Sequence, residues 1–319
     1  MAQVPNGNNI QAPARRGASG FLAAELRGDL RCARCRYNLR GLSVTGPCPE
    51  CGTPVRVTLL VTVDPMAAEL RPVRVPWLTA HGLILWSGAA MLAALVLWWM
   101  RIIDLLGQPG WGQVGWLRPA VVAFAAVSGV GALALVAPQA GIPRAARIAA
   151  AVGCVLYIPL CILLFRLHFV IDTSGPAPYG LSALPRMDRS IVRVFALAVL
   201  AGILLCLRPN ARLLAARSFL MRTGRVDRQT MAAMLGVIGM IALGDAIIIG
   251  AGGGRAPVQD VMRQVGQLVI MVGSMLLTVG LVGVVVDCIR LRAVILEPPL
   301  SLEELLEPSP GGARNATAP

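Results

Sequence analysis

Hydrophobic residues gather in long stretches after residue 76, whereas the first 76 residues are mixed and polar. Six of these stretches approach the ~20 residues with which an α-helix crosses a hydrocarbon core about 30 Å thick. This pattern predicts an all-α polytopic membrane protein with six transmembrane helices. The alternative, buried helices of a large soluble core, fits six stretches of this length less well. The predicted spans are 77–100, 119–137, 148–165, 190–207, 230–250 and 268–286.

The polar segments complete the predicted domain organisation. Residues 1–24 lack an apolar run and are expected to be disordered, and no signal peptide is recognisable before the first span. We expect that span to act as an uncleaved anchor. The remaining predicted parts are a small cysteine-bearing head at 25–65, a proline-bearing linker at 66–76, the six-helix domain at 77–290 and a cytoplasmic tail at 291–319.

Composition narrows the function classes. Hydrophobic residues make up 56% of the chain and charged residues 14%, against roughly 25% charged in soluble domains. All 29 basic residues are arginine, so a lysine Schiff base and a Walker-type phosphate loop are excluded. The two histidines, His81 and His168, lie in no recognisable catalytic pattern and are expected at the membrane interface. We therefore predict that the protein is not an enzyme.

The arginines also predict orientation. On the six-span topology, 21 arginines fall on the side of the two termini and seven on the other side. Positively charged loops remain in the cytoplasm, so both termini are predicted to be cytoplasmic, in a bacterial inner membrane. The net charge of +13 is explained by this distribution. Nucleic acid binding is therefore not required, although it is not excluded.

One basic loop predicts a lipid contact. It holds six arginines between Arg208 and Arg228, interleaved with apolar residues. Such a segment is suited to an interfacial helix that faces anionic lipid head groups, in addition to the bilayer that surrounds the spans. The tail carries an acidic run at 303–307. We expect that run to form a short helix that docks on the basic loop.

Two CxxC pairs in the head predict a metal site. Cys32, Cys35, Cys48 and Cys51 place four thiolates within reach of one tetrahedral ion. Four thiolates close the coordination sphere, so the metal is expected to be structural zinc; a rubredoxin-like iron centre is the alternative. A reducing cytoplasm disfavours disulfides. The β-rich segment 55–63 is predicted to form a strand beside the site, which makes the head a small β-rich zinc ribbon.

The head also resembles a known kind of module. Many uncharacterised bacterial multi-pass membrane proteins begin with a zinc ribbon of the pattern CxxCGY(D/N)LRGL followed by CPECGxP. The resemblance covers about 25 residues, departs at Arg36, where the pattern has glycine, and implies a zinc ribbon in an inner-membrane setting without implying an activity. The matching residues are Cys32, Cys35, Tyr37, Asn38, Leu39, Arg40, Gly41, Leu42, Cys48, Pro49, Glu50, Cys51, Gly52 and Pro54.

Two charged residues fall inside predicted spans. Asp245 lies well within the fifth span and Arg193 near the outer end of the fourth. Because these spans form an antiparallel hairpin, the two side chains are expected to pair, which lowers the cost of burying each. The pair is interpreted as a structural contact, and a proton or ion site is the alternative.

Two functions follow from these parts. The first is a membrane-anchored interaction or adaptor module, whose zinc ribbon recruits a cytoplasmic protein or nucleic acid. The second is a transporter or channel with the ribbon as a regulatory appendage. A closed four-thiolate site favours the first. The second needs polar residues that face one another across several spans, and the sequence offers mainly Asp245 and Arg193.

Overall fold

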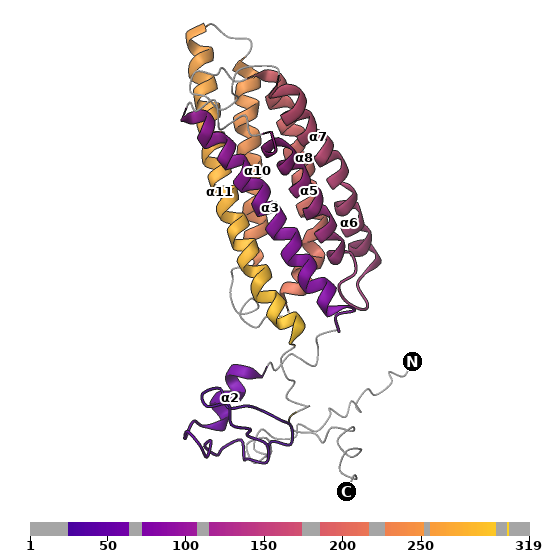
Figure 1. Cartoon of the computed structure of the whole chain (residues 1–319), viewed down its shortest axis with the longest axis vertical. Helices are drawn as coiled ribbons and strands as arrows, with labels where there is room; N and C mark the ends of the chain where they lie inside the picture. Colours follow the sequence, from indigo (N-terminus) through magenta and orange to yellow (C-terminus); the bar gives the residue numbers. More distant parts are fainter. Residues whose placement is uncertain are drawn as a thin grey trace, which may run out of the picture. The chain divides into compact units, whose positions relative to one another are not determined.

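The computed structural model describes residues 25–63, 72–106, 115–173, 186–216, 227–251, 256–297 and 305. The chain divides into two compact units (Figure 1). The head comprises Met1–Leu70 with Pro299–Pro319, and the bundle comprises Arg71–Pro298. The predicted disorder of residues 1–24 lies outside the described residues.

The bundle confirms the six predicted spans. Six of its described helical segments are long and apolar enough to cross a membrane. The last of them extends to Leu296, six residues beyond the boundary predicted at 290. The helices are α3 (Pro76–Leu105), α5 (Leu117–Ala132) with the turn η2 (Leu133–Leu135), α6 (Arg144–Val155) with α7 (Tyr157–Phe165) and η3 (Arg166–Ile171), α8 (Met187–Ala215), α10 (Asp227–Gly250) and α11 (Ala256–Leu296).

The six spans pack in a closed ring. Helix α3 packs against α5, α5 against α7, and the α6–α7 segment against α8. Helix α8 packs in turn against α10, α10 against α11, and α11 returns to α3. Figure 1 shows these helices side by side. Because the ring closes, inward-facing side chains from every span can meet in one interior.

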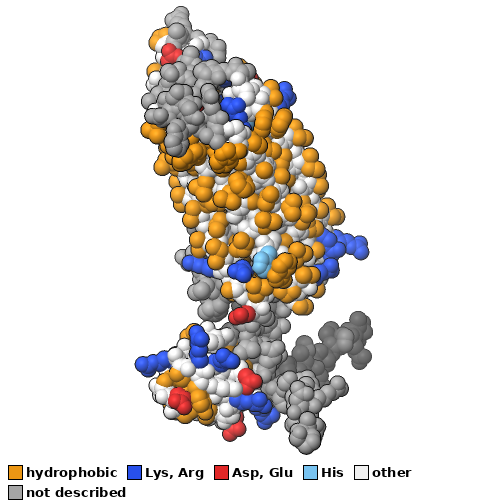
Figure 2. Space-filling view, in the orientation of Figure 1, with side chains coloured by type: hydrophobic (Ala, Val, Ile, Leu, Met, Phe, Trp, Pro, Cys, Tyr) orange, Lys and Arg blue, Asp and Glu red, His pale blue; other side chains and the backbone are white. Residues whose placement is uncertain are grey.

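The outside of the bundle is apolar. Large hydrophobic side chains cover the face shown in Figure 2, with arginines nearer its two ends. On α11, for example, Leu268 is 62% and Val279 is 68% exposed. Soluble proteins rarely expose contiguous apolar patches larger than a few hundred Å². The exterior therefore fits a hydrocarbon solvent, and the chain is a multi-pass membrane protein.

Glycine allows the closest helix crossings in the bundle. A Cβ added to Gly244 on α10 would lie 2.8 Å from the Gly266 carbonyl oxygen of α11 and 2.7 Å from the Ile270 Cγ1 atom. Elsewhere on α10, a Cβ at Gly239 would meet nothing within 4 Å. In membranes, van der Waals contact across such small residues drives helix association. Gly244 therefore sets the distance between α10 and α11.

The difference between Gly244 and Gly239 allows a prediction with a matched control on the same helix. Gly244→Ala is expected to force α10 and α11 apart and to lower the bundle's free energy of unfolding by about 1–3 kcal/mol, the usual cost of overpacking. Gly239→Ala should be neutral or slightly stabilising, because alanine favours helix. Thermal unfolding of the two variants in detergent measures both effects. Equal melting temperatures for the two variants would contradict the assigned crossing.

Part of the linker predicted at 66–76 belongs to the bundle. Residues 72–75 lie against the loop that follows η2, where the Arg74 backbone N–H donates to the Pro138 carbonyl at 3.1 Å. Val73 and Gln139 form an isolated β-bridge. Residues 72–75 are therefore part of the bundle, and residues 64–71 lie outside the described part of the chain.

The head is not β-rich, so the predicted strand at 55–63 is wrong. That segment is the helix α2 (Val55–Thr62). Residues 25–63 contain no strand longer than a single bridge. The bridges join Glu25 to Ser43, Arg31 to Asn38 and Pro47 to Pro54.

Burial explains why this segment is helical. Val55 and Thr58 are completely buried, and Leu59 packs partly against the same core. The spacing of these residues matches one face of a helix, whereas a strand would bury alternate residues. Leu60 and Val61 are instead 80% and 71% exposed. The β propensity of the segment is a weak preference that tertiary packing overrides.

The tail contributes to the head. Leu305, which is 1% exposed, packs in the head core with Leu26, Leu39 and Val55. The backbone N–H of Arg27 donates to the carbonyl oxygen of Leu305 at 2.8 Å. Since a membrane cannot divide one core, the head and Leu305 lie on the same side, which agrees with an even number of spans. The predicted docking of the tail on the basic loop is untested, because residues 217–226 lie outside the described part.

Candidate functional site

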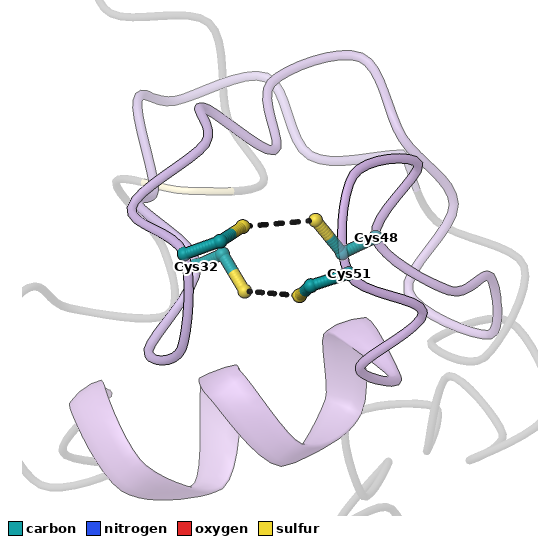
Figure 3. Close-up of side chains that lie close together, drawn as sticks. Cys32, Cys48 and Cys51 are labelled. Carbon is teal, nitrogen blue, oxygen red and sulfur yellow. Dashed lines mark hydrogen bonds between the residues drawn. The ribbon is translucent and has the colours of Figure 1, made fainter.

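The four predicted cysteine ligands meet in the head. Their Sγ atoms all lie within 4.8 Å of one another. The Cys32–Cys51 and Cys35–Cys48 sulfur pairs are each 3.6 Å apart, far beyond a disulfide length of about 2.05 Å (Figure 3). A tetrahedral ion with metal–sulfur bonds of about 2.3 Å requires sulfurs roughly 3.8 Å apart. The cluster therefore fits a single four-coordinate metal ion.

Two matching turns present these thiols. In the first turn the Arg36 N–H donates to the Cys32 carbonyl, and in the second the Gly52 N–H donates to the Cys48 carbonyl, both at 2.9 Å. Arg36 and Gly52 each have a positive φ, 64° and 69°. Cys32 and Cys48 each donate their backbone N–H to a residue beyond the turn, at 2.8 Å. The chain thus builds the same turn twice around one centre.

Hydrogen bonds around the cluster lower the pKa of two of the four cysteines, Cys32 and Cys51, and so favour their thiolate forms. Backbone N–H groups of Cys35 and Arg34 donate to the Cys32 thiol and lower its pKa to about 6. Hydrogen bonds with the Thr53 hydroxyl and backbone lower the pKa of Cys51. At Cys35 a hydrogen bond at Tyr37 lowers the pKa, but desolvation and the neighbouring thiols raise it to about 12. Four thiolates so close together require a cation among them.

Arg36 marks a strained position in the first turn. Its φ of 64° lies in the left-handed region, where a residue with a Cβ is disfavoured by about 1–2 kcal/mol. The resembling pattern has glycine at this position. The departure from the pattern is therefore accommodated by the backbone, and all four ligands keep their places.

Arg36→Gly is expected to stabilise the head by about 0.5–1 kcal/mol, because the gain in φ freedom exceeds the entropy that glycine loses on folding. Arg34→Gly, in the same turn but without a positive φ, should destabilise it. Protease resistance of residues 25–63 in the full-length protein, titrated with denaturant, measures both changes. A lower midpoint for Arg36→Gly would contradict the strain.

The structure pairs the two predicted charges inside the bundle. Arg193 on α8 donates from Nε to both carboxylate oxygens of Asp245 on α10, at 2.9 and 2.7 Å, and its Nη2 also donates to Oδ1 of Asp245. The Asp245 side chain is completely buried and that of Arg193 is 16% exposed. This bidentate contact satisfies two charges that would be costly to bury separately.

A second buried cluster was missed. His168 in η3 is completely buried inside the bundle and is not exposed on its surface. Its Nδ1 atom lies 3.1 Å from one carboxylate oxygen of Asp172, and Arg189 Nε donates to the other at 2.8 Å. Two features of the sequence could have indicated this cluster. His168 and Asp172 are four residues apart, and Arg189 and Arg193 have the same spacing, which places each pair on one helix face. The predicted fourth span begins at residue 190, which places Arg189 outside the span and Arg193 inside it.

The interior of the bundle contains a cavity of about 270 Å³. Its lining comes from α3, α5, α7, η3, α8, α10 and α11, so every span contributes. Most of the wall is aliphatic, and its charged or titratable side chains are Arg101, Tyr157, His168, Arg189 and Arg193. On the same wall, the Trp86 indole donates to the Tyr157 hydroxyl at 2.9 Å.

The predicted lipid contact between Arg208 and Arg228 is only partly described. Arg208 and Arg212 lie in the last turns of α8, which ends at Ala215. Residues 217–226 are outside the described part of the chain. Contact with anionic lipid at this loop stays a prediction.

Comparison with known proteins finds no counterpart: no protein-family model, no curated protein and no solved structure matches this chain.

Proposed function

We propose that this protein is a membrane-anchored interaction module, without enzymatic activity, whose head is folded by a structural Zn²⁺ ion and recruits a partner protein. The observation that carries the proposal is the closed set of four sulfurs. A filled tetrahedron leaves no position for a reacting water or substrate. Such a site supports a surface, and zinc is the ion that structural four-cysteine sites usually hold. The resemblance to zinc-ribbon membrane proteins points to the same module.

The surface that the metal site supports is the outer face of α2. Val57, Leu60 and Val61 are 41%, 80% and 71% exposed on it. The inner face of the same helix holds Thr58, whose hydroxyl oxygen accepts a hydrogen bond from the Ala33 N–H between the first two ligands. The apolar face is therefore held in place by the cysteine cluster and offers area to a protein partner.

Cross-linking in cells tests this function. The wild type is compared with Cys48→Ser/Cys51→Ser, which removes the metal, and with Leu60→Asp, which changes only the exposed face. Thr45→Asp adds the same charge at another exposed position of the head and serves as the control. A partner retained by the wild type and the control but lost from both other variants is expected. Identical cross-links in all four proteins would contradict recruitment.

The proposed setting is a bacterial inner membrane with both termini in the cytoplasm. The excess of 21 arginines over seven supports this orientation. A reporter active only in the periplasm, fused within residues 217–226, should be inactive, whereas the same reporter fused within residues 174–185 should be active. The opposite pattern would reverse the orientation without changing the number of spans.

Transport is the second candidate, and the cavity is the observation that favours it. The structure brings polar side chains from several spans to one interior, including His168, Arg189 and Arg193. The sequence had suggested only one such pair. Uptake of a solute that is lost when the cavity is filled, but unaffected by Cys48→Ser/Cys51→Ser, would favour transport over recruitment.

A further inference from the structure

Helix α11 is longer than a membrane span needs to be. It has 41 residues, from Ala256 to Leu296, which corresponds to about 61 Å along a helix. A hydrocarbon core is about 30 Å thick, and a whole bilayer with its head groups measures about 40–45 Å. Even a tilt of 40°, the upper limit for membrane helices, leaves about 47 Å of depth. Both ends of α11 therefore cannot lie in hydrocarbon.

The sequence shows which part of α11 crosses the hydrocarbon. Residues 268–286 carry no charged side chain and cover about 28 Å. Polar and charged residues lie on both sides of this stretch: Gln259, Asp260, Arg263, Gln264 and Gln267 before it, and Asp287, Arg290 and Arg292 after it. The segments 256–267 and 287–296 are therefore the ends that extend from the hydrocarbon.

One face of α11, here called its outer face, is apolar and exposed from end to end. Its twelve residues are spaced alternately three and four apart, and each is exposed. The opposite side packs into the bundle, where Gly266 and Ile270 are buried against α10. The outer face consists of Val258, Val261, Val265, Leu268, Val272, Met275, Val279, Val282, Val286, Ile289, Ala293 and Leu296.

Lipid explains only the middle of this face. Within 268–286 an apolar exterior is what a hydrocarbon solvent requires. Val258, Val261 and Ile289 lie on the two end segments and are 56%, 59% and 54% exposed. Lipid tails do not cover these ends, and burying apolar surface there gains about 25 cal/mol per Å². Inside the membrane no such gain exists between helices. The two ends therefore favour contact with a protein surface.

The spacing of the outer face identifies that surface. Alternating steps of three and four residues are the a and d positions of a coiled-coil heptad. Valine occupies each a position from Val258 to Val286, and β-branched residues at a favour two parallel strands. Copies of one chain enter the membrane in the same orientation, so a two-fold axis along the membrane normal makes their α11 helices parallel. The same face then meets itself in register.

Charge complementarity supports this register. In a parallel pair, a residue at g lies near the e position five residues further along the partner helix. Arg292 occupies g and Glu297 the following e position, and both are exposed. The Glu297 backbone N–H still donates to the Ala293 carbonyl at 2.9 Å, so this residue continues the last helical turn. Each copy can therefore offer opposite charges to the other at this end.

We propose that α11 is a homodimer interface, in which two copies of this chain pair in parallel along the outer face. The a and d residues with their e and g neighbours number about 20 on each side, which is the usual size of a specific interface. The apolar ends outside the hydrocarbon supply the driving force, and the middle provides packing. The inference is independent of what the head recruits.

The test is cysteine cross-linking of full-length protein in native membranes, with copper phenanthroline as the oxidant. Val261→Cys, Met275→Cys and Ile289→Cys place a thiol at d positions of the outer face. Asp260→Cys adds a thiol next to Val261, exposed but off that face, and Leu92→Cys adds one at an exposed position of α3 and reports random collisions. The wild type reports the native cysteines.

A disulfide forms only where two Cα atoms approach within about 7 Å. The three d-position variants are therefore expected to give at least tenfold more cross-linked dimer than Asp260→Cys, Leu92→Cys or the wild type. Cross-linking at Leu92→Cys as strong as at the d positions would overturn the proposal, because random collision in lipid would then explain all of it.

Native mass spectrometry in detergent provides a second readout. The wild type is expected at twice the chain mass of 33.6 kDa. Val258→Asp/Val261→Asp removes the apolar surface of one end, so it should reduce the dimer at least tenfold, and the same change should reduce the cross-linking of Ile289→Cys at least tenfold. Thermal transitions report that each bundle is folded. An undiminished dimer in the folded Val258→Asp/Val261→Asp variant would overturn the proposal.

Discussion

Cys48→Ser is expected to abolish metal binding and to unfold residues 25–63 while the bundle stays folded. Structural zinc supplies about 10–16 kcal/mol of apparent binding free energy in small modules. The head core of Leu26, Leu39, Val55, Leu305 and their neighbours is too small to replace that amount. Limited proteolysis of the full-length protein, with metal analysis of the same sample, measures both effects.

Cys161→Ser on α7 is the matched control, because it makes the same change outside the head. It should leave metal content and head proteolysis at their wild-type values. Protection of the Cys48→Ser head equal to that of the wild type would show that the metal does not fold it. Loss of the bundle's thermal transition in this variant would contradict the division into two units.

Asp245→Ala is expected to destabilise the bundle by about 3–5 kcal/mol. The change leaves Arg193 largely buried, and an unpaired buried charge is costly. Asp245→Ala/Arg193→Leu should recover most of the loss, since apolar residues often replace a buried ion pair at little cost. Unfolding by heat or denaturant in detergent, analysed as a double-mutant cycle, measures the coupling.

Asp260→Ala provides the control for an exposed ion pair. Asp260 lies 3.9 Å from Arg263 and its side chain is 59% exposed, so its removal should cost less than about 1 kcal/mol. Similar losses for Asp260→Ala and Asp245→Ala would show that burial does not distinguish the two pairs. No recovery in the double variant would mean that Asp245 has a role beyond neutralising Arg193.

Features with a local signature could be predicted from the sequence. Six spans follow from length and apolar content, and the four ligands follow from the spacing of two CxxC pairs. The contact of Arg193 with Asp245 was predictable because a lone charge inside a span needs an opposite charge, and adjacent antiparallel spans bring few candidates together. The structure has all three features.

Features that depend on tertiary packing could not be predicted. The segment 55–63 has β-branched residues, but it folds as a helix that buries Val55 and Thr58. Leu305 lies more than 240 positions from the head residues it contacts, and no local pattern announces such a contact. Asp172 lies beyond the predicted end of the third span at 165, yet it is buried where it contacts His168 and Arg189.

X-ray absorption at the zinc edge, with metal analysis of the full-length protein purified under reducing conditions, tests the central claim most directly. The claim is that four cysteine thiolates fold the head around one zinc ion. The expected result is one zinc per chain with four sulfur neighbours at about 2.3 Å, and none in Cys48→Ser/Cys51→Ser. Substoichiometric zinc, nitrogen or oxygen neighbours, or a red iron-containing protein would contradict the claim.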